Sequence, residues 1–388
     1  MTKRISPQTS TLYFANAKAT RFDYKASLAA KLDRIIERLE FAKHFEKGEL
    51  VAVKMHLGNP GSHRTIPPVL VKRVVDAIKK IGAKPFVADS VRLPGYLYLE
   101  TANENGYNAQ TLGCPVIMAD GIFGNDSVEV KAGRHLKTAL IPSAFYDVKS
   151  MVVLTHATGH AAYGFGGAMK NIAMGLIGHH CRGSSWEDGG RGLMHMVGGR
   201  KFDVQLENCE LCGQCVEICP LGAINVADER IEIDWNKCWR CLRCTRVCQF
   251  GALLSPKVSD DFYEAQAEGA KAAMSTFESG KVLHISFLLN LQPECDCMPM
   301  SGIPVVSDIG LLGGQDMIAI DWATLDMVGD SQPNSGSQAE GMKNSREKTV
   351  FCQINNRNSR RTLEFAEKMG LGSTKYEIVD ISDPEKNN

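Results

Sequence analysis

The chain has 388 residues, 44 basic and 44 acidic side chains, 13 cysteines and a formal net charge of zero. That length allows more than one domain with a sizeable core, and the balanced charge gives no indication of a nucleic-acid or membrane-surface partner. The start lacks the apolar core of a signal peptide and no stretch approaches ~20 apolar residues, so we expect a cytoplasmic protein that does not span a membrane.

Strands and helices are predicted to alternate through the first 156 residues. Short apolar runs predict strands at 50–57, 85–89, 114–120 and 151–156. Apolar residues at steps of three and four predict helices at 26–45, 67–82 and 97–106. This alternation predicts an α/β fold with a mainly parallel sheet and flanking helices.

Ionisable side chains stand where the four predicted strands give way to loops: His56, Asp89, Asp120 and His156. Ligands of open parallel sheets bind outside the carboxyl ends of the strands. We therefore expect these side chains to line one crevice and to supply protons for catalysis. For each residue alone, the alternative is a polar group that closes its strand and caps the next turn.

A glycine- and histidine-rich stretch follows the fourth strand. Its segment GFGGAMKN, residues 164–171, lacks the pattern of a Walker A loop. The segment could begin a helix whose N-terminus binds an anion, with Lys170 as a point charge, or it could serve tight backbone packing. Among the histidines, we favour His156 and His160 as metal ligands or proton donors.

The next stretch contains C-x-x-C-x-x-C-x-x-x-C twice, at 209–219 and at 238–248, so that every cysteine of the first copy recurs in the second at one constant offset. In such motifs three close-spaced cysteines hold one four-iron four-sulfur cluster, and the fourth reaches across to the other cluster. Zinc sites need two C-x-x-C pairs and no regularly spaced third cysteine. Cluster one is predicted to take Cys209, Cys212, Cys215 and Cys248, and cluster two Cys238, Cys241, Cys244 and Cys219.

The repeat predicts an inserted ferredoxin-like α+β domain at 201–257, between two parts of an α/β domain at 1–200 and 258–388. The second copy of the motif is basic, with Lys237, Arg240, Arg243 and Arg246. These side chains could dock an acidic electron donor, or they could form an ordinary solvated face, which we favour.

The remaining chain returns to the α/β pattern. A helix is predicted at 259–278, strands at 281–289 and 305–310, and a helix at 317–328. A polar, Gly- and Ser-rich segment at 330–347 is expected to be a mobile surface loop, before a last helix at 359–370 and a strand at 376–380. No G-x-G-x-x-G sequence follows a strand, which argues against NAD bound in the Rossmann manner.

Cys295 and Cys297 lie one residue apart between two of these predicted elements. A C-x-C pair can offer two thiolates to one metal ion, with His156 or His160 completing the site. The pair could instead cycle between dithiol and disulfide, or consist of two buried thiols without a role.

Four blocks in this order resemble the family catalogued as domain of unknown function 362, in the branch fused to a two-cluster ferredoxin. The resemblance covers about residues 50–330. It rests on GFGGAMKNIAMG at 164–175, the double cysteine motif, ECDC at 294–297, and VVSDIG with the Asp-rich helix after it at 305–326. It implies a cytoplasmic iron–sulfur protein and names no reaction. Thr158 stands where relatives often have a lysine, so no cationic contact is expected there.

The favoured function is an oxidoreductase that passes electrons through two four-iron four-sulfur clusters to a small anionic substrate in the α/β crevice. The alternatives are an electron-transfer protein that docks a protein partner and a scaffold that handles metal or clusters. Expected partners are the substrate and an electron donor such as a ferredoxin or flavodoxin. More than 300 residues lie outside the cysteine-rich insert, which favours the enzyme over the carrier.

Overall fold

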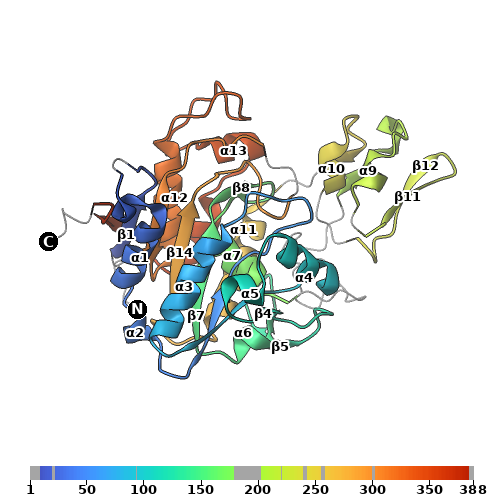
Figure 1. Ribbon diagram of the computed structural model, residues 1–388. Helices are drawn as coiled ribbons and strands as arrows, with labels where there is room; N and C mark the ends of the chain where they lie inside the picture. The colour runs from blue at the N-terminus through green and yellow to red at the C-terminus, as the bar shows by residue number, and fades with distance from the viewer. Residues whose placement is uncertain are drawn as a thin grey trace, which may run out of the picture.

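One eight-stranded sheet organises the protein, in the order β16-β1-β15-β14-β7-β2-β3-β4 (Figure 1). The computed structural model describes residues 9–19, 22–92, 94–178, 202–219, 221–238, 243–254, 258–298 and 302–383. The strands are β1 Ser10–Asn16, β2 Leu50–Lys54, β3 Lys84–Asp89, β4 Val116–Met118, β7 Ser150–His156, β14 Val282–Leu288, β15 Gly310–Gly314 and β16 Tyr376–Asp380.

The sheet is mainly parallel, which confirms the predicted fold class. The pairs β1–β16, β14–β7, β7–β2, β2–β3 and β3–β4 are parallel. Only β15 runs the other way, antiparallel to both β1 and β14. The sheet takes strands from residues before 178 and after 258, which together we call the α/β body.

Alternating side chains send apolar residues to both faces of the sheet. Val51 and Val53 of β2 pack with α1 (Leu28–Arg38) and α3 (Pro68–Lys80). Ala52 faces the other core, with α7 (Ala168–Gly175), α11 (Asp260–Met274) and α12 (Met317–Gly329). The strands are therefore buried on both faces, as parallel sheets require. Among the described residues, no helix is long and apolar enough to cross a membrane.

Shorter elements complete the α/β body. Small antiparallel ladders join β5 (Ser127–Lys131) to β6 (Thr138–Pro142) and β8 (Thr158–His160) to β9 (Gly164–Gly166). The remaining helices are η1 Tyr24–Ala26, α2 Phe41–His44, α4 Gly95–Glu104, α5 Ala109–Leu112, α6 Ser143–Tyr146, α13 Val350–Asn355 and α14 Arg361–Lys368.

Three local predictions were wrong. The helix expected at 26–45 is divided into α1 and α2, because Glu40 between them has a left-handed φ of 47°. The strand expected at 305–310 forms only at 310–314. The segment 330–347, expected to be mobile, is bonded to the body: Asn344 donates to the carbonyls of Val328 and Ser331.

The described residues of 202–254 form a separate cysteine-rich module, which lies at the right of the α/β body in Figure 1. Its own apolar core includes Phe202, Ile224 and Ile231. Its elements are β10 Asp203–Val204, η2 Leu206–Asn208, α9 Gln214–Glu217, β11 Ile224–Ala227, β12 Arg230–Ile233, α10 Arg243–Val247 and β13 Leu253–Leu254.

The sequence repeat of the module is also a structural repeat. The starts of α9 and α10 are related by the same offset as the cysteines, and the two helices pack against each other. Gly222 and Gly251, which this offset also relates, both have a positive φ, at 56° and 72°. The antiparallel pair β10–β13 corresponds in the same way to the pair β12–β11.

The order of the strands places a crevice at one edge of the sheet. From β2 the chain moves outward through β3 to β4, and then returns to the other side of β2 with β7 and β14. The carboxyl ends of β2 and β7 therefore flank a topological switch point, where open α/β sheets bind their ligands.

Candidate active site

A small cavity lies at this switch point. Its volume is about 30 Å³, room for a water molecule or two. Three of the catalytic residues predicted from the sequence line it: His56 just after β2, His156 at the end of β7, and Lys170 of α7. Cys295 and Asp296 close the cavity from the loop after β14.

His156 is held by acceptors on both ring nitrogens. Nδ1 lies 2.7 Å from Oδ1 of Asp296, and Nε2 lies 2.7 Å from the carbonyl oxygen of Leu289. Burial alone would lower the pKa of His156, but the Asp296 carboxylate and the backbone carbonyl raise it. Two acceptors require two ring protons, so His156 is an imidazolium paired with Asp296, with no lone pair for a metal.

Lys170 is half-buried beside the cavity. Burial, and then the charges of Arg92 and Lys54, lower the pKa of Lys170 to about 7, against the opposite effects of Asp296 and Asp89. An ammonium group with this pKa can donate a proton and recover it near neutral pH.

Asp89 does not line the cavity, because its carboxylate is used within a buried network. It forms an ion pair with the Lys54 ammonium at 3.1 Å and accepts a hydrogen bond from the Tyr98 hydroxyl at 2.6 Å. Lys54 also donates to the side chain of Asn171, which lines the cavity. Asp89 therefore supports the wall of the site and lies behind it.

Asp120 lies away from the cavity. Its Oδ1 accepts the backbone N–H of Val91 at 2.7 Å, which ties the loop after β3 to the loop after β4. The expectation that all four strand-end residues line one crevice is therefore wrong for Asp89 and Asp120, since hydrogen bonds within the protein engage both carboxylates.

The N-terminus of α7 holds a carboxylate of the protein itself. Asp321 of α12 accepts the backbone N–H groups of Ala168 and Met169 at 2.7 and 2.8 Å. Burial raises the pKa of Asp321 to about 7, against the opposing effect of these two N–H groups. The Asp321 carboxylate therefore already occupies the position at this helix terminus where the sequence suggested that a substrate anion could bind.

The glycines of the same segment serve close packing. A Cβ atom on Gly167 would lie 2.3 Å from Oδ1 of Asp321, and one on Gly175 would lie 2.2 Å from Cε of Lys54. The structure therefore favours the packing interpretation of GFGGAMKN over the anion-binding one.

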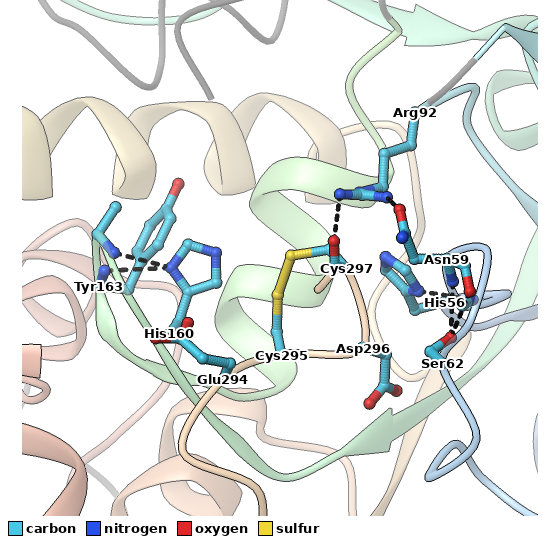
Figure 2. The surroundings of a disulfide bond; sticks show 12 residues. His56, Asn59, Ser62, Arg92, His160, Tyr163, Glu294, Cys295, Asp296 and Cys297 are labelled. Carbon is cyan, nitrogen blue, oxygen red and sulfur yellow. Dashed lines mark hydrogen bonds between the residues drawn. A yellow bond between two sulfur atoms is a disulfide. The ribbon is translucent and has the colours of Figure 1, made fainter. Parts of the chain in front are cut away.

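His160, Cys295 and Cys297 form a second cluster next to the cavity, with ligand atoms within 4.8 Å of one another. Such a group could hold a metal ion. In this structure the two cysteines form a disulfide. Nδ1 of His160 accepts the backbone N–H groups of Ala162 and Tyr163 at 3.1 and 3.3 Å, and Figure 2 shows the other ring nitrogen on the side of the disulfide.

Two arginines join the cysteine-containing loop to its surroundings. Arg92, from the loop after β3, donates to the Cys297 carbonyl at 2.6 Å and to the Asn59 side chain at 2.9 Å (Figure 2). Arg243, in the second cysteine motif of the module, donates to the same two oxygens at 3.0 and 3.1 Å. The module thus docks on the loop that carries Cys295 and Cys297.

Two of the basic residues of the second motif, Arg243 and Arg246, contact the body. Arg243 is buried, and Arg246 forms an ion pair with Glu294, the residue before Cys295. The prediction of a solvated face is wrong for these two, because the body supplies their acceptors. Lys237 is exposed, and Arg240 lies outside the described residues.

A larger hollow of about 690 Å³ opens between the module and the body. Arg246 and Arg357 both line it, together with Glu294 and Asn355. Burial lowers the pKa of Arg357, against the opposing effect of Tyr263, and the charge of Arg246 lowers it further. Within the described part of the chain, the buried Nε atom of Arg357 has no hydrogen-bond partner.

Seven of the eight motif cysteines lie in the described module, and Cys241 lies outside it. Burial, and further the neighbouring thiols of Cys209 and Cys212, raise the pKa of Cys215, so the first three thiols lie together. The fourth cysteines each accept a backbone N–H: Cys219 from Ala223 at 3.2 Å and Cys248 from Leu253 at 3.4 Å. Cys238 and Cys244 are buried in the module core.

Sequence reasoning missed Arg92, Asp296 and Asn59. Asp296 stands between the two cysteines, where its charge could have marked it as a partner for a strand-end histidine. Arg92 and Asn59 lie in loops without periodicity, and no local signal connects them with a cysteine so distant in the chain.

The chain matches one known family. Residues 51–326 match the family described as domain of unknown function (DUF362). No curated protein matches the sequence.

Distant similarity exists to solved structures. The lactate racemase apoprotein from Thermoanaerobacterium thermosaccharolyticum has 10% identity and a TM-score of 0.39, with 83% of this chain and 58% of that chain covered. A protein from Thermotoga maritima, solved by a structural genomics consortium, has 8% identity and a TM-score of 0.36, with 69% and 52% covered. The chain spans little more than half the length of each.

Proposed function

The chain belongs to the family described as domain of unknown function 362, and we propose that it is an iron–sulfur oxidoreductase. In this proposal, two four-iron four-sulfur clusters in the module pass electrons to a small anionic substrate on the α/β body.

The observation that carries the proposal is the contact of Arg243 with the Cys297 carbonyl. Arg243 immediately precedes Cys244, one of the predicted ligands of cluster two. The same side chain therefore belongs to the cysteine motif and touches the loop beside the switch-point cavity. A carrier module attached only by a flexible linker would not need a buried arginine in this position.

The cysteine residues fit the proposed clusters. Two structurally equivalent halves pack against each other through α9 and α10, and each half ends in a cysteine sulfur that accepts a backbone N–H. Hydrogen bonds to cluster sulfurs tune reduction potentials. When bound, such clusters supply single electrons. The cluster ligands would be those of the sequence prediction, Cys209, Cys212, Cys215 and Cys248 for one and Cys238, Cys241, Cys244 and Cys219 for the other.

The electron donor is expected to approach the first cysteine motif. Cys212 is exposed, whereas Cys244 and Arg243 of the second motif are buried. A ferredoxin or flavodoxin is a donor of the appropriate kind, and its electrons would travel inward from the exposed motif to the docked one.

The hollow of about 690 Å³ is the proposed place of the substrate, since binding sites for small molecules have volumes of roughly 300–1,000 Å³. Glu294 neutralises Arg246, which leaves Arg357 as the cation for an anionic group. The switch-point cavity is too small for a metabolite, but the same loop lines both sites, with Cys295 and Asp296 at the cavity and Glu294 at the hollow. Lys170 there can supply the protons that accompany the electrons.

One observation is the basis of each alternative function, the electron-transfer protein and the scaffold that handles metal. The small volume of the switch-point cavity favours an electron-transfer protein, because a carrier needs no substrate site. The cluster of His160, Cys295 and Cys297 has the residue types of a metal site, and this composition is the basis of the scaffold alternative.

The test uses full-length protein prepared without oxygen. The clusters are reduced with dithionite, the protein is mixed with pools of anionic metabolites, and reoxidation is followed by visible absorbance. Arg243→Met and Arg357→Met are compared with Lys237→Met, a control at the residue immediately before the second motif, whose side chain is 65% exposed.

Reoxidation that requires a metabolite and slows in Arg243→Met and Arg357→Met, but not in Lys237→Met, supports the oxidoreductase. Reoxidation by other redox proteins alone, at the same rate in all variants, identifies a carrier. Protein that binds zinc and contains no sulfide would refute the proposal.

A further inference from the structure

The loop with Cys295 and Cys297 is fixed from several sides. The Gly159 N–H of β8 donates to the Gln292 carbonyl at 2.7 Å, before the cysteines. Arg92 and Arg243 hold the Cys297 carbonyl, after the first cysteine. The two cysteines are joined by a disulfide, with Cα atoms 5.2 Å apart.

The two sulfurs differ in their surroundings. Cys295 is buried and lines the switch-point cavity with Lys170. Cys297 is half-buried and carries the carbonyl to which both guanidinium groups donate. Lys170 shares the cavity with Cys295 and can give up a proton to it, whereas the two guanidinium groups at the Cys297 backbone stay charged. Cys297 is therefore better suited than Cys295 to hold a negative charge.

His160 is oriented as a donor toward the sulfurs. Its Nδ1 accepts two backbone N–H groups and therefore carries no proton. In a neutral imidazole the proton must then lie on Nε2, the nitrogen on the side of the disulfide in Figure 2. An N–H group in this position can donate to a thiolate.

The same tautomer argues against a metal ion. A histidine that binds metal usually donates its second ring N–H to an acceptor. The Nδ1 atom of His160 faces two donors instead, so Nε2 of the neutral ring has no lone pair to offer.

We propose that Cys295 and Cys297 form a redox-active pair, in which His160 holds the thiolate of Cys297 by a hydrogen bond. The proposal rests on the proposed function only for the source of the electrons, a one-electron donor such as the cysteine-rich module. Two electrons break the sulfur–sulfur bond. Cys295 takes one proton through the cavity and becomes a thiol, and Cys297 becomes the thiolate.

The return step balances this reduction. A substrate that accepts two electrons takes them from the pair, together with the proton of Cys295, and the sulfur–sulfur bond forms again. The loop contacts the module through Arg243 and also borders the hollow with Arg246 and Arg357, so the pair lies close to both the module and the proposed substrate site.

In the test, full-length protein is equilibrated with mixtures of reduced and oxidised dithiothreitol and then quenched with acid. The protein is denatured and alkylated, and the modified cysteines are mapped by mass spectrometry. Cys295 and Cys297 should change together, in a fraction that follows the ratio of the two dithiothreitol forms. Cys114, a single buried thiol, should be alkylated in every mixture and serves as the control.

A second measurement tests the role of His160. In the reduced native protein, Cys297 should react with iodoacetamide before Cys295. His160→Leu should slow this reaction by about tenfold near neutral pH, since the thiolate is the reactive form. His160→Asn, which keeps an N–H donor, should recover part of the rate.

The inference is overturned if the pair stays entirely disulfide or entirely dithiol in all mixtures. It is also overturned if one metal ion per chain, beyond the cluster iron, is lost in the Cys295→Ser, Cys297→Ser double variant. Dithiothreitol acts on the pair directly and does not need the clusters. If the cysteine pair follows the ratio of reduced to oxidised dithiothreitol while the clusters show no metabolite-dependent reoxidation, the inference stands and the proposed function is refuted. If the Cys295→Ser, Cys297→Ser double variant keeps the wild-type rate of metabolite-dependent reoxidation, the proposed function stands and the inference of a redox-active pair is overturned.

Discussion

Replacing Gly159 by alanine should displace the loop that carries the cysteine pair. A Cβ atom on Gly159 would lie 2.0 Å from the Pro293 carbonyl oxygen, whereas ordinary contacts begin at 3.4 Å. The hairpin β8–β9 and the loop must therefore move apart to relieve this overlap, which breaks the Gly159 N–H hydrogen bond to Gln292. The strand conformation of Gly159 itself suits alanine, so this contact is the main source of the effect.

The expected cost follows from three contributions. Overpacking of a rigid contact costs about 1–3 kcal/mol, and the lost hydrogen bond costs about 1 kcal/mol. The lower entropy of the unfolded alanine chain offsets about 0.4–1 kcal/mol. We therefore expect Gly159→Ala to reduce the free energy of unfolding by about 1–3.6 kcal/mol.

Urea unfolding measures this difference, with Gly302→Ala as the matched control. Gly302 lies later in the same connection between β14 and β15, and a Cβ atom there would meet nothing within 4 Å. The control should therefore stay within about 0.5 kcal/mol of the wild type. The alanine at 159 should also change the alkylation rate of reduced Cys297. Equal stability and equal alkylation in both variants would refute the reasoning.

Three further predictions concern titration and metal content. Because the pKa of Lys170 is lowered to about 7 from 10.5, the folded protein binds this proton less tightly than the unfolded chain. The free energy of unfolding should rise with pH through that window in the wild type and rise less in Lys170→Met, as urea titrations would reveal. Burial lowers the pKa of His284 to about 4, so the free energy of unfolding should fall as the pH drops from about 6.5 to about 4. His284→Leu should recover about 2 kcal/mol of this free energy near pH 5, and equal acid sensitivity of wild type and variant would contradict the prediction. Anaerobic protein should contain roughly eight iron and eight sulfide, and Cys212→Ser should lose mainly the iron of cluster one; an unchanged iron content in the variant would exclude Cys212 as a ligand.

The parts of the fold that depend on local periodicity could be predicted from the sequence. The helix after Pro67 buries Leu70, Val74 and Ile78 as its spacing predicted. The short apolar runs form parallel strands, and the rule for their carboxyl ends brings His56 and His156 to one cavity.

The partners of the site residues could not be predicted in this way. The carboxylate at the N-terminus of α7 comes from Asp321, 153 residues beyond Ala168. The contact between Arg243 and Cys297 joins two units of the fold. Such pairings depend on how elements pack in three dimensions, and neither hydrophobic period nor motif spacing encodes them.

The position of β14 also affects how the protein is made. β7 pairs with β2 on one side and with β14 on the other, yet residues 157–281, including the whole cysteine-rich module, separate β7 from β14 in the chain. At translation rates of about 5–20 residues per second, one edge of β7 stays unpaired on the ribosome for about 6–25 s. An open strand edge invites pairing with other chains. If slow folding of residues 202–254 also delayed the pairing of β14 with β7, nascent chains could aggregate through β7 for a longer time.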